Sequence, residues 1–156
     1  MTAHDRAADA RADNAPGRPI LVAGWIANAL FAVTAIPAAI IGEDAIEALA
    51  IAVALLLFFI AIGAFAYAFA IAVARSTRGD NVAVANLFFL DGSAPRQVRR
   101  DFLVLFLACL AIAAATAAWE PFGVLVPMLP VGLAGVWAAR HGTFPPRPPQ
   151  TPRRRV

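Results

Sequence analysis

Four uncharged apolar runs make up most of the chain, and short polar segments separate them. The runs lie at 20–41, 48–74, 102–118 and 121–139. About 20 helical residues cross the roughly 30 Å hydrocarbon core of a bilayer, so the first and last runs fit directly and the second can tilt. The third is short, and we expect Trp119 and the turn before Asp101 to extend it. No run carries the charged stripe of a buried soluble helix. The pattern therefore predicts an all-α membrane protein with a four-transmembrane-helix bundle at 20–139.

The polar segments divide the rest of the chain. Residues 1–19 are predicted to be a disordered cytoplasmic tail before an uncleaved first span. Residues 140–156 form a Pro/Arg-rich cytoplasmic tail, which either offers a polyproline docking peptide or lies against anionic lipid. The cytoplasmic loop at 75–101 contains an apolar stretch, Asn81 to Leu90, that is too short to span. We expect it to form a short amphipathic helix at the membrane interface or packed under the bundle.

Charge is segregated along the chain. All 13 basic residues are arginine, and they lie in the two tails and the loop 75–101 together with six of the ten acids. The other two loops carry only acids: Glu43, Asp44, Glu47 and Glu120. The positive-inside rule therefore predicts a multi-pass protein of the cell (plasma) membrane with cytoplasmic N- and C-termini. Tryptophans lie near span ends, as in an aromatic belt: Trp25, Trp119 and Trp137.

The basic character of the chain bears on its partners. The sequence pI is about 10.4, but the arginines adjoin apolar spans and do not form a face of a folded domain. This placement indicates anionic lipid headgroups at the cytoplasmic face of the lipid bilayer as the counter-charge, and no nucleic acid.

Small residues indicate where the helices pack, because lipid removes the hydrophobic drive for helix association. The second run carries two stripes of alanine at helical spacing, which predicts that this helix is central and touches two neighbours. The stripes are Ala64, Ala68 and Ala72, and Ala66, Ala70 and Ala74. In the fourth run, Gly132 and Gly135 offer a further close-contact surface.

Few residues within the runs could carry chemistry. Asn28 is the most polar side chain inside a span, and we expect it to form an interhelical hydrogen bond or to contact a substrate or ion. Pro127 and Pro130 interrupt the fourth run, which predicts a kink that is either static or part of a transport pathway. Thr34 and Thr116 are expected to return their hydroxyl bonds to their own helices.

The sequence contains no recognisable catalytic, metal or cofactor motif, which argues against an enzyme and a bound cofactor. The single cysteine, Cys109, cannot form an internal disulfide. The runs contain no Asp, Glu, Lys, Arg or His, which counts against a proton-driven exporter. Glu47 and Glu120 lie at the outer span ends, where we expect both to be solvated.

Two segments carry a resemblance. They are Arg78 to Arg100, RGDNVAVANLFFLDGSAPRQVRR, and Gly123 to Arg147, GVLVPMLPVGLAGVWAARHGTFPPR. Both resemble segments of a group of small, uncharacterised multi-span membrane proteins of actinobacteria. The resemblance implies a bacterial plasma membrane and adds no site residues.

Interaction surfaces are therefore visible in the sequence, and reactive groups are not. The leading hypothesis is a non-catalytic accessory or scaffold component of the plasma membrane, with a membrane protein partner or a homo-oligomer. The alternative is a small oligomeric channel or transporter that uses Asn28 and the kinked fourth span.

Overall fold

The computed structural model describes residues 16–146, so most of the predicted tail at 1–19 and the end of the predicted tail at 140–156 lie outside the described residues. Within 16–146 the secondary structure is helical, which confirms the prediction of an all-α fold for this part of the chain. The elements are α2 (Arg18–Ile41), α3 (Asp44–Thr77), α4 (Val84–Phe88), α5 (Arg96–Thr116), the 3₁₀ helix η1 (Pro121–Leu125) and α6 (Met128–His141).

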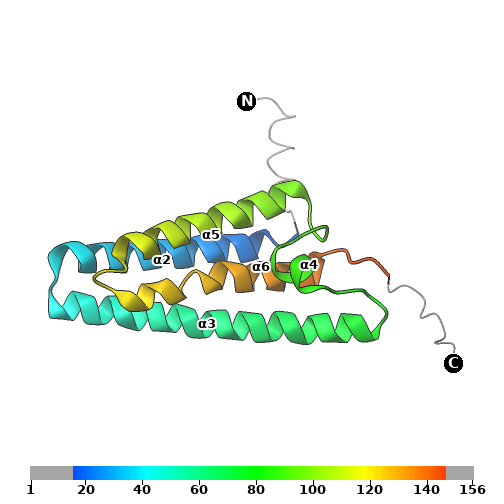
Figure 1. The fold of residues 1–156 in the computed structure, drawn as a ribbon, viewed down its shortest axis with the longest axis horizontal. Helices are drawn as coiled ribbons and strands as arrows, with labels where there is room; N and C mark the ends of the chain where they lie inside the picture. Colours follow the sequence, from blue (N-terminus) through cyan, green and yellow to red (C-terminus); the bar gives the residue numbers. More distant parts are fainter. Residues whose placement is uncertain (1–15, 147–156) are drawn as a thin grey trace, which may run out of the picture.

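The first two long helices begin and end at residues that suit helix termini. Pro19 lies in the first turn of α2, where its missing N–H costs no hydrogen bond. Gly42 ends α2 in the left-handed conformation with φ 65°, and its N–H donates to the Ala38 carbonyl. Asp44 and Glu47 then lie in the first turn of α3, where the helix dipole favours acids. These two helices form an antiparallel hairpin (Figure 1).

Three helical segments of the described chain are long and apolar enough to cross a membrane: α2, α3 and the segment Pro121–His141. This supports a membrane protein. Helix α3 has 34 residues, about 51 Å at 1.5 Å per residue, and so exceeds the predicted run 48–74 at both ends. A helix can continue through charged residues, because its backbone hydrogen bonds form in the same way with charged and apolar side chains.

Helix α5 is not among these three segments. It begins at Arg96, so that its first six residues include four charged ones: Arg96, Arg99, Arg100 and Asp101. It ends at Thr116, two residues before the predicted end of the third run. The uncharged part is therefore 102–116, about 22 Å long, which is shorter than the roughly 30 Å hydrocarbon core.

The predicted fourth run is two helices. The 3₁₀ helix η1 ends at Leu125, and Pro127 is the N-cap of α6. Pro130 falls in the first turn of α6, where the helix has no backbone partner for an N–H in any case. Both prolines therefore start a helix here.

Helix α6 lies at the centre of the bundle. It contacts α2, α3, α4 and α5, with α3 and α5 on opposite sides of it (Figure 1). In the most apolar 18-residue stretch of Pro121–His141, 61% of residues are buried, against 22% in α3. The prediction that the second span is central was therefore wrong, although α3 does contact two long neighbours, α2 and α6. The alanine stripe of α3 correctly indicated a helix contact, and the glycines of α6 allow α6 to approach α3 closely.

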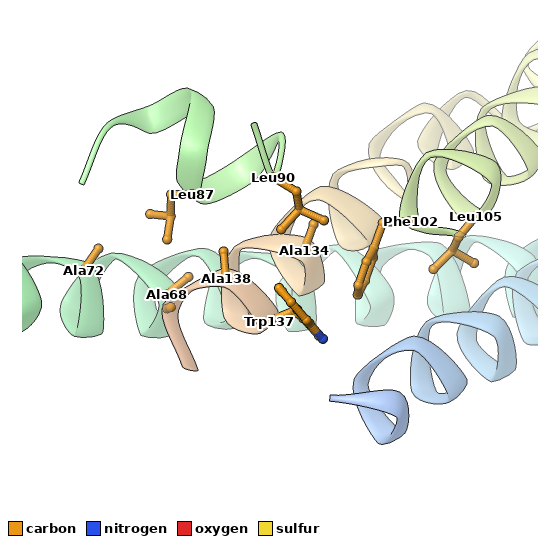
Figure 2. Close-up of a cluster of buried hydrophobic side chains, with 10 residues drawn as sticks. Ala68, Ala72, Leu87, Leu90, Phe102, Leu105, Ala134, Trp137 and Ala138 are labelled. Atoms are coloured by element: carbon orange, nitrogen blue, oxygen red, sulfur yellow. The ribbon is translucent and has the colours of Figure 1, made fainter. Parts of the chain in front are cut away.

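Two buried clusters fill the bundle. One surrounds α6 near its C-terminus, where Leu87 and Leu90 point from the α4 region towards α3 and α6, and Phe102 of α5 lies near Trp137 (Figure 2). Trp137 is 4% exposed, and its Nε1 donates to the Pro16 carbonyl at 3.2 Å. The aromatic-belt prediction was therefore wrong for Trp137, since its indole is packed in protein. The other cluster lies around Phe31 and contains residues of α2, α3, α5 and α6.

The apolar stretch 81–90 forms only the five-residue helix α4. Its Leu87 is buried against the bundle, and α4 contacts α6. Of the two alternatives for this stretch, the contacts favour packing under the bundle.

Candidate functional site

The described charges lie at two ends of the bundle. The arginine end is where α2 begins, α6 ends and α4 lies; the acidic end holds the α2–α3 turn and the α5–η1 turn (Figure 1). The arginine end includes Arg18, Arg75, Arg96 and Arg140, and the acidic end includes Glu43, Asp44, Glu47 and Glu120. The segregation expected from sequence is therefore present in the fold.

Glu120 is the most unusual residue of the acidic end. It is 0% exposed, and neither Oε1 nor Oε2 has a hydrogen-bond partner among the described residues. The prediction that Glu120 is solvated was therefore wrong. It is the N-cap residue of η1, a position where a carboxylate can accept a backbone N–H, yet its side chain makes no capping bond.

The surroundings of the Glu120 carboxyl are apolar. A Cβ placed on Gly123 would lie 2.9 Å from Glu120 Oε2 and 3.1 Å from Phe31 Cζ, so the carboxyl and the Phe31 ring share the space that Gly123 leaves open. Phe31 is ten residues before the end of α2, about 15 Å along the helix. The carboxyl therefore lies well inside the bundle, and this burial raises the pKa of Glu120 above its ordinary value.

Asn28 lies one turn before Phe31 on α2 and faces the interior. It is 6% exposed, and its Oδ1 has no hydrogen-bond partner in the described part of the chain. The expected interhelical bond to this oxygen is therefore not observed. The neighbouring hydroxyls behave as predicted: Thr34 Oγ1 donates to the Leu30 carbonyl at 3.0 Å, and Thr116 Oγ1 donates to the Ile112 carbonyl at 3.0 Å.

The predicted close-contact glycines of α6 lie against α3. A Cβ on Gly132 would be 3.2 Å from Ala64 Cβ, and one on Gly135 would be 3.2 Å from Ala68 Cβ and 2.6 Å from Phe88 Cδ1. One predicted alanine stripe of α3 thus packs on these glycines. The other stripe, Ala66, Ala70 and Ala74, is exposed.

At the arginine end, Arg75 joins three segments. Its Nε donates to Asp80 Oδ2 at 2.8 Å, and its Nη1 donates to the carbonyls of Ala139 at 3.2 Å and Gly142 at 3.0 Å. Its guanidinium also lies 4.6 Å from the centroid of the Phe144 ring. We call this group of contacts the Arg75 latch. It satisfies carbonyls at the end of α6 that the helix itself leaves unpaired.

The chain after α6 is also bonded to the loop. Asn81 N donates to the Pro145 carbonyl at 2.8 Å, and Thr143 N donates to the Ser93 carbonyl at 3.0 Å. Sequence reasoning placed these residues in a tail and missed the pairing, because no local pattern links positions more than 45 residues apart.

A groove of about 1120 Å³ opens at the arginine end. It lies between the start of α2, the start of α5 and the end of α6, and its lining includes Arg18, Asp101, Trp137 and His141.

Within residues 16–146 no group of three or more His, Cys, Asp and Glu side chains could hold a metal ion. Comparison with known proteins adds no further assignment: no family model, no curated protein and no solved structure matches this chain.

Proposed function

We propose that this chain is a four-span, non-catalytic accessory or scaffold component of the plasma membrane, with both termini in the cytoplasm. Its three long apolar segments support membrane insertion. The arginine end would face the cytoplasm, where the positive-inside rule places arginine. Helix α5 would serve as the remaining span, with Arg96, Arg99 and Arg100 extending to headgroups at the inner surface.

The outward face of α3 supports this role most directly. Ala66, Ala70 and Ala74 are exposed along α3, while the parallel stripe of the same helix packs on glycines of α6. Large side chains stand beside the exposed stripe, since Phe69 is 63% exposed and Tyr67 is 47% exposed. Small residues between large ones allow two membrane helices to approach closely, so this face suits a helix of a partner membrane protein.

The test is purification from native membranes in a gentle detergent. We expect the wild-type protein to copurify with a partner, and Ala70→Leu to lose it, because a bulky side chain would fill the stripe. Ala52→Leu, at an exposed position on the same helix nearer its start, is the matched control. A lone monomer with no copurifying protein contradicts the proposal.

A channel or transporter is the second candidate, favoured by one observation. The Asn28 carbonyl oxygen is buried without a hydrogen-bond partner among the described residues, and the helix is broken between η1 and α6 at Pro127. Unpaired polar groups beside a broken helix are the usual setting of a substrate or ion site. In reconstituted vesicles, this candidate predicts solute flux that Asn28→Leu abolishes. Flux that is unchanged by Asn28→Leu removes Asn28 from the pathway.

The proposed topology has its own test. Reporter fusions at Asp44, at Gly92 and at the two termini are expected to place Asp44 outside and the other three positions inside. A fusion at Gly92 that reports the outside contradicts four spans with this orientation.

A further inference from the structure

We propose that Glu120 is a proton-binding site: its carboxyl group holds a proton while it lies between α2 and η1, and that proton keeps the α5–η1 turn closed. The site does not depend on an accessory or a transport role for the chain. It goes beyond both, because it names a ligand, the proton, and a residue that takes it.

The geometry leaves a charged carboxylate without support. The side chain has no exposed surface, and its two oxygens have no hydrogen-bond partner among residues 16–146. Moving an ionised carboxylate from water into such surroundings is so unfavourable that the group takes up a proton instead. A protonated carboxyl needs far less solvation, and it fits the space beside Gly123 and Phe31.

Among residues 16–146, no neighbouring element supplies a compensating cation at this depth. Helix α2 carries one charged residue, Arg18, at its far end, and η1 carries none. The charged residues of α5 lie in its first six positions, at the arginine end. Helix α3 begins with Asp44 and Glu47, which are acidic. The other titratable group of this core is the buried thiol of Cys109 on α5.

Ionisation would therefore have to move the side chain. The backbone of Glu120 is held, because its N–H donates to the Thr116 carbonyl at 2.9 Å and its carbonyl accepts from Gly123 N at 3.2 Å. For the carboxylate to reach water, the short α5–η1 turn must separate from α2. Proton binding and turn closure are thus the same equilibrium. If the chain has the topology proposed above, the proton comes from outside the cell. The rest of the inference does not depend on that topology.

The sign of the pH effect follows from the raised pKa. Burial raises the folded-state pKa of Glu120 above that of the unfolded chain, so between the two values the folded state binds a proton that the unfolded state has released. This contribution to stability is complete below the ordinary glutamate pKa of about 4.3, and it is lost as pH rises through the folded-state pKa.

Infrared spectroscopy of the full chain in detergent tests the site. At pH 7 exposed carboxyl groups are ionised, so we expect the wild type to retain an absorption band of one protonated carboxyl group. The band should disappear in Glu120→Gln, which mimics the protonated side chain, and should persist in Glu43→Gln, which alters an exposed acid at the same end. The absence of the band in the wild type at pH 7, or its persistence in Glu120→Gln, overturns the proposal.

Thermal unfolding provides a second readout. The melting temperature of the wild type should fall relative to that of Glu120→Gln as pH rises above about 4.3, while Glu43→Gln should follow the wild type. A pH-independent difference between wild type and Glu120→Gln contradicts proton binding. Replacing choline by sodium at constant pH should change neither the band nor the melting temperature; loss of the band in sodium would assign the site to a metal cation and overturn the proposal.

Discussion

The two ends of the bundle treat charge in opposite ways. At the arginine end, the Arg75 side chain is 24% exposed and makes contacts with a carboxylate, two backbone carbonyls and an aromatic ring. At the acidic end, Glu120 is fully buried, and its carboxyl oxygens have no hydrogen-bond partner within the described chain. Position in the sequence does not distinguish them, since both residues lie at the ends of apolar runs.

The difference teaches that burial and partnership have to be considered together. A buried ion with several partners fixes neighbouring segments, and removal of one partner is costly. A buried polar group without partners stores unfavourable free energy, so its replacement by an apolar group is neutral or stabilising. Substitutions at the arginine end should therefore destabilise the fold, and replacement of a buried polar group that has no partner should cost little or stabilise it.

The largest expected effect is at the arginine end, with Gly135→Leu. A side chain at this position meets Phe88 of α4 and Ala68 of α3, so overpacking should lower the free energy of unfolding by about 3 kcal/mol. Chemical or thermal unfolding in detergent measures it. Gly63→Leu is the control, because a Cβ at Gly63 meets nothing within 4 Å. Equal melting temperatures for the two variants would contradict the α3–α6 contact.

Breaking the Arg75 latch should have the next largest effect. Arg75→Gln removes the ion pair to Asp80 and shortens the reach to the α6 carbonyls, which should lower the free energy of unfolding by about 2 kcal/mol. Limited proteolysis of the loop 78–95 should quicken at the same time. Arg78→Gln, three residues along and exposed, should leave both measurements near those of the wild type. If Arg78→Gln has the same effect as Arg75→Gln, the loss of stability comes from the change in net charge and not from the loss of the latch.

Asn28→Leu tests a second buried polar group without a partner, in the interior of α2 and away from both ends. Because Asn28 Oδ1 is buried without a partner, an apolar side chain of similar size should raise the free energy of unfolding by about 1 kcal/mol. The same unfolding experiment measures it. A clear loss of stability would show that this amide has a partner in the membrane.

The smallest expected effect belongs to Thr34→Val. Its hydroxyl donates only to carbonyls of its own helix, those of Leu30 and Phe31, so its loss should cost about 0.5 kcal/mol. The sign is the useful result: Thr34→Val and Asn28→Leu should shift the melting temperature in opposite directions.

Much of the helical pattern could be predicted from the sequence. The runs at 20–41 and 48–74 correspond to α2 and α3, because an uninterrupted apolar run of this length is typical of a helix in a membrane. Their ends could not be predicted from the absence of charge, since α3 continues through Asp44 and Arg75. The fourth run was harder, because Pro127 can kink a helix or begin one, and only the packing of η1 distinguishes these outcomes.

The candidate site was predicted only in part. Asn28 could be found because it is the one amide in an apolar run, and Gly132 and Gly135 because small residues indicate close contact. Glu120 was misplaced, because its burial depends on how far the α5–η1 turn lies below the tip of the α2–α3 hairpin, a relation between distant segments. Gly123, three residues further on, was a usable signal, since it leaves room for the carboxyl.

The Arg75 latch has a consequence for biosynthesis. Arg75 donates to the carbonyls of Ala139 and Gly142, which are 64 and 67 residues further along the chain. The loop residue Asn81 likewise donates its N–H to the carbonyl of Pro145. A ribosome adds these residues well after the loop between α3 and α5, so the loop is made long before its hydrogen-bond partners. A segment that is synthesised later thus secures one that is synthesised earlier.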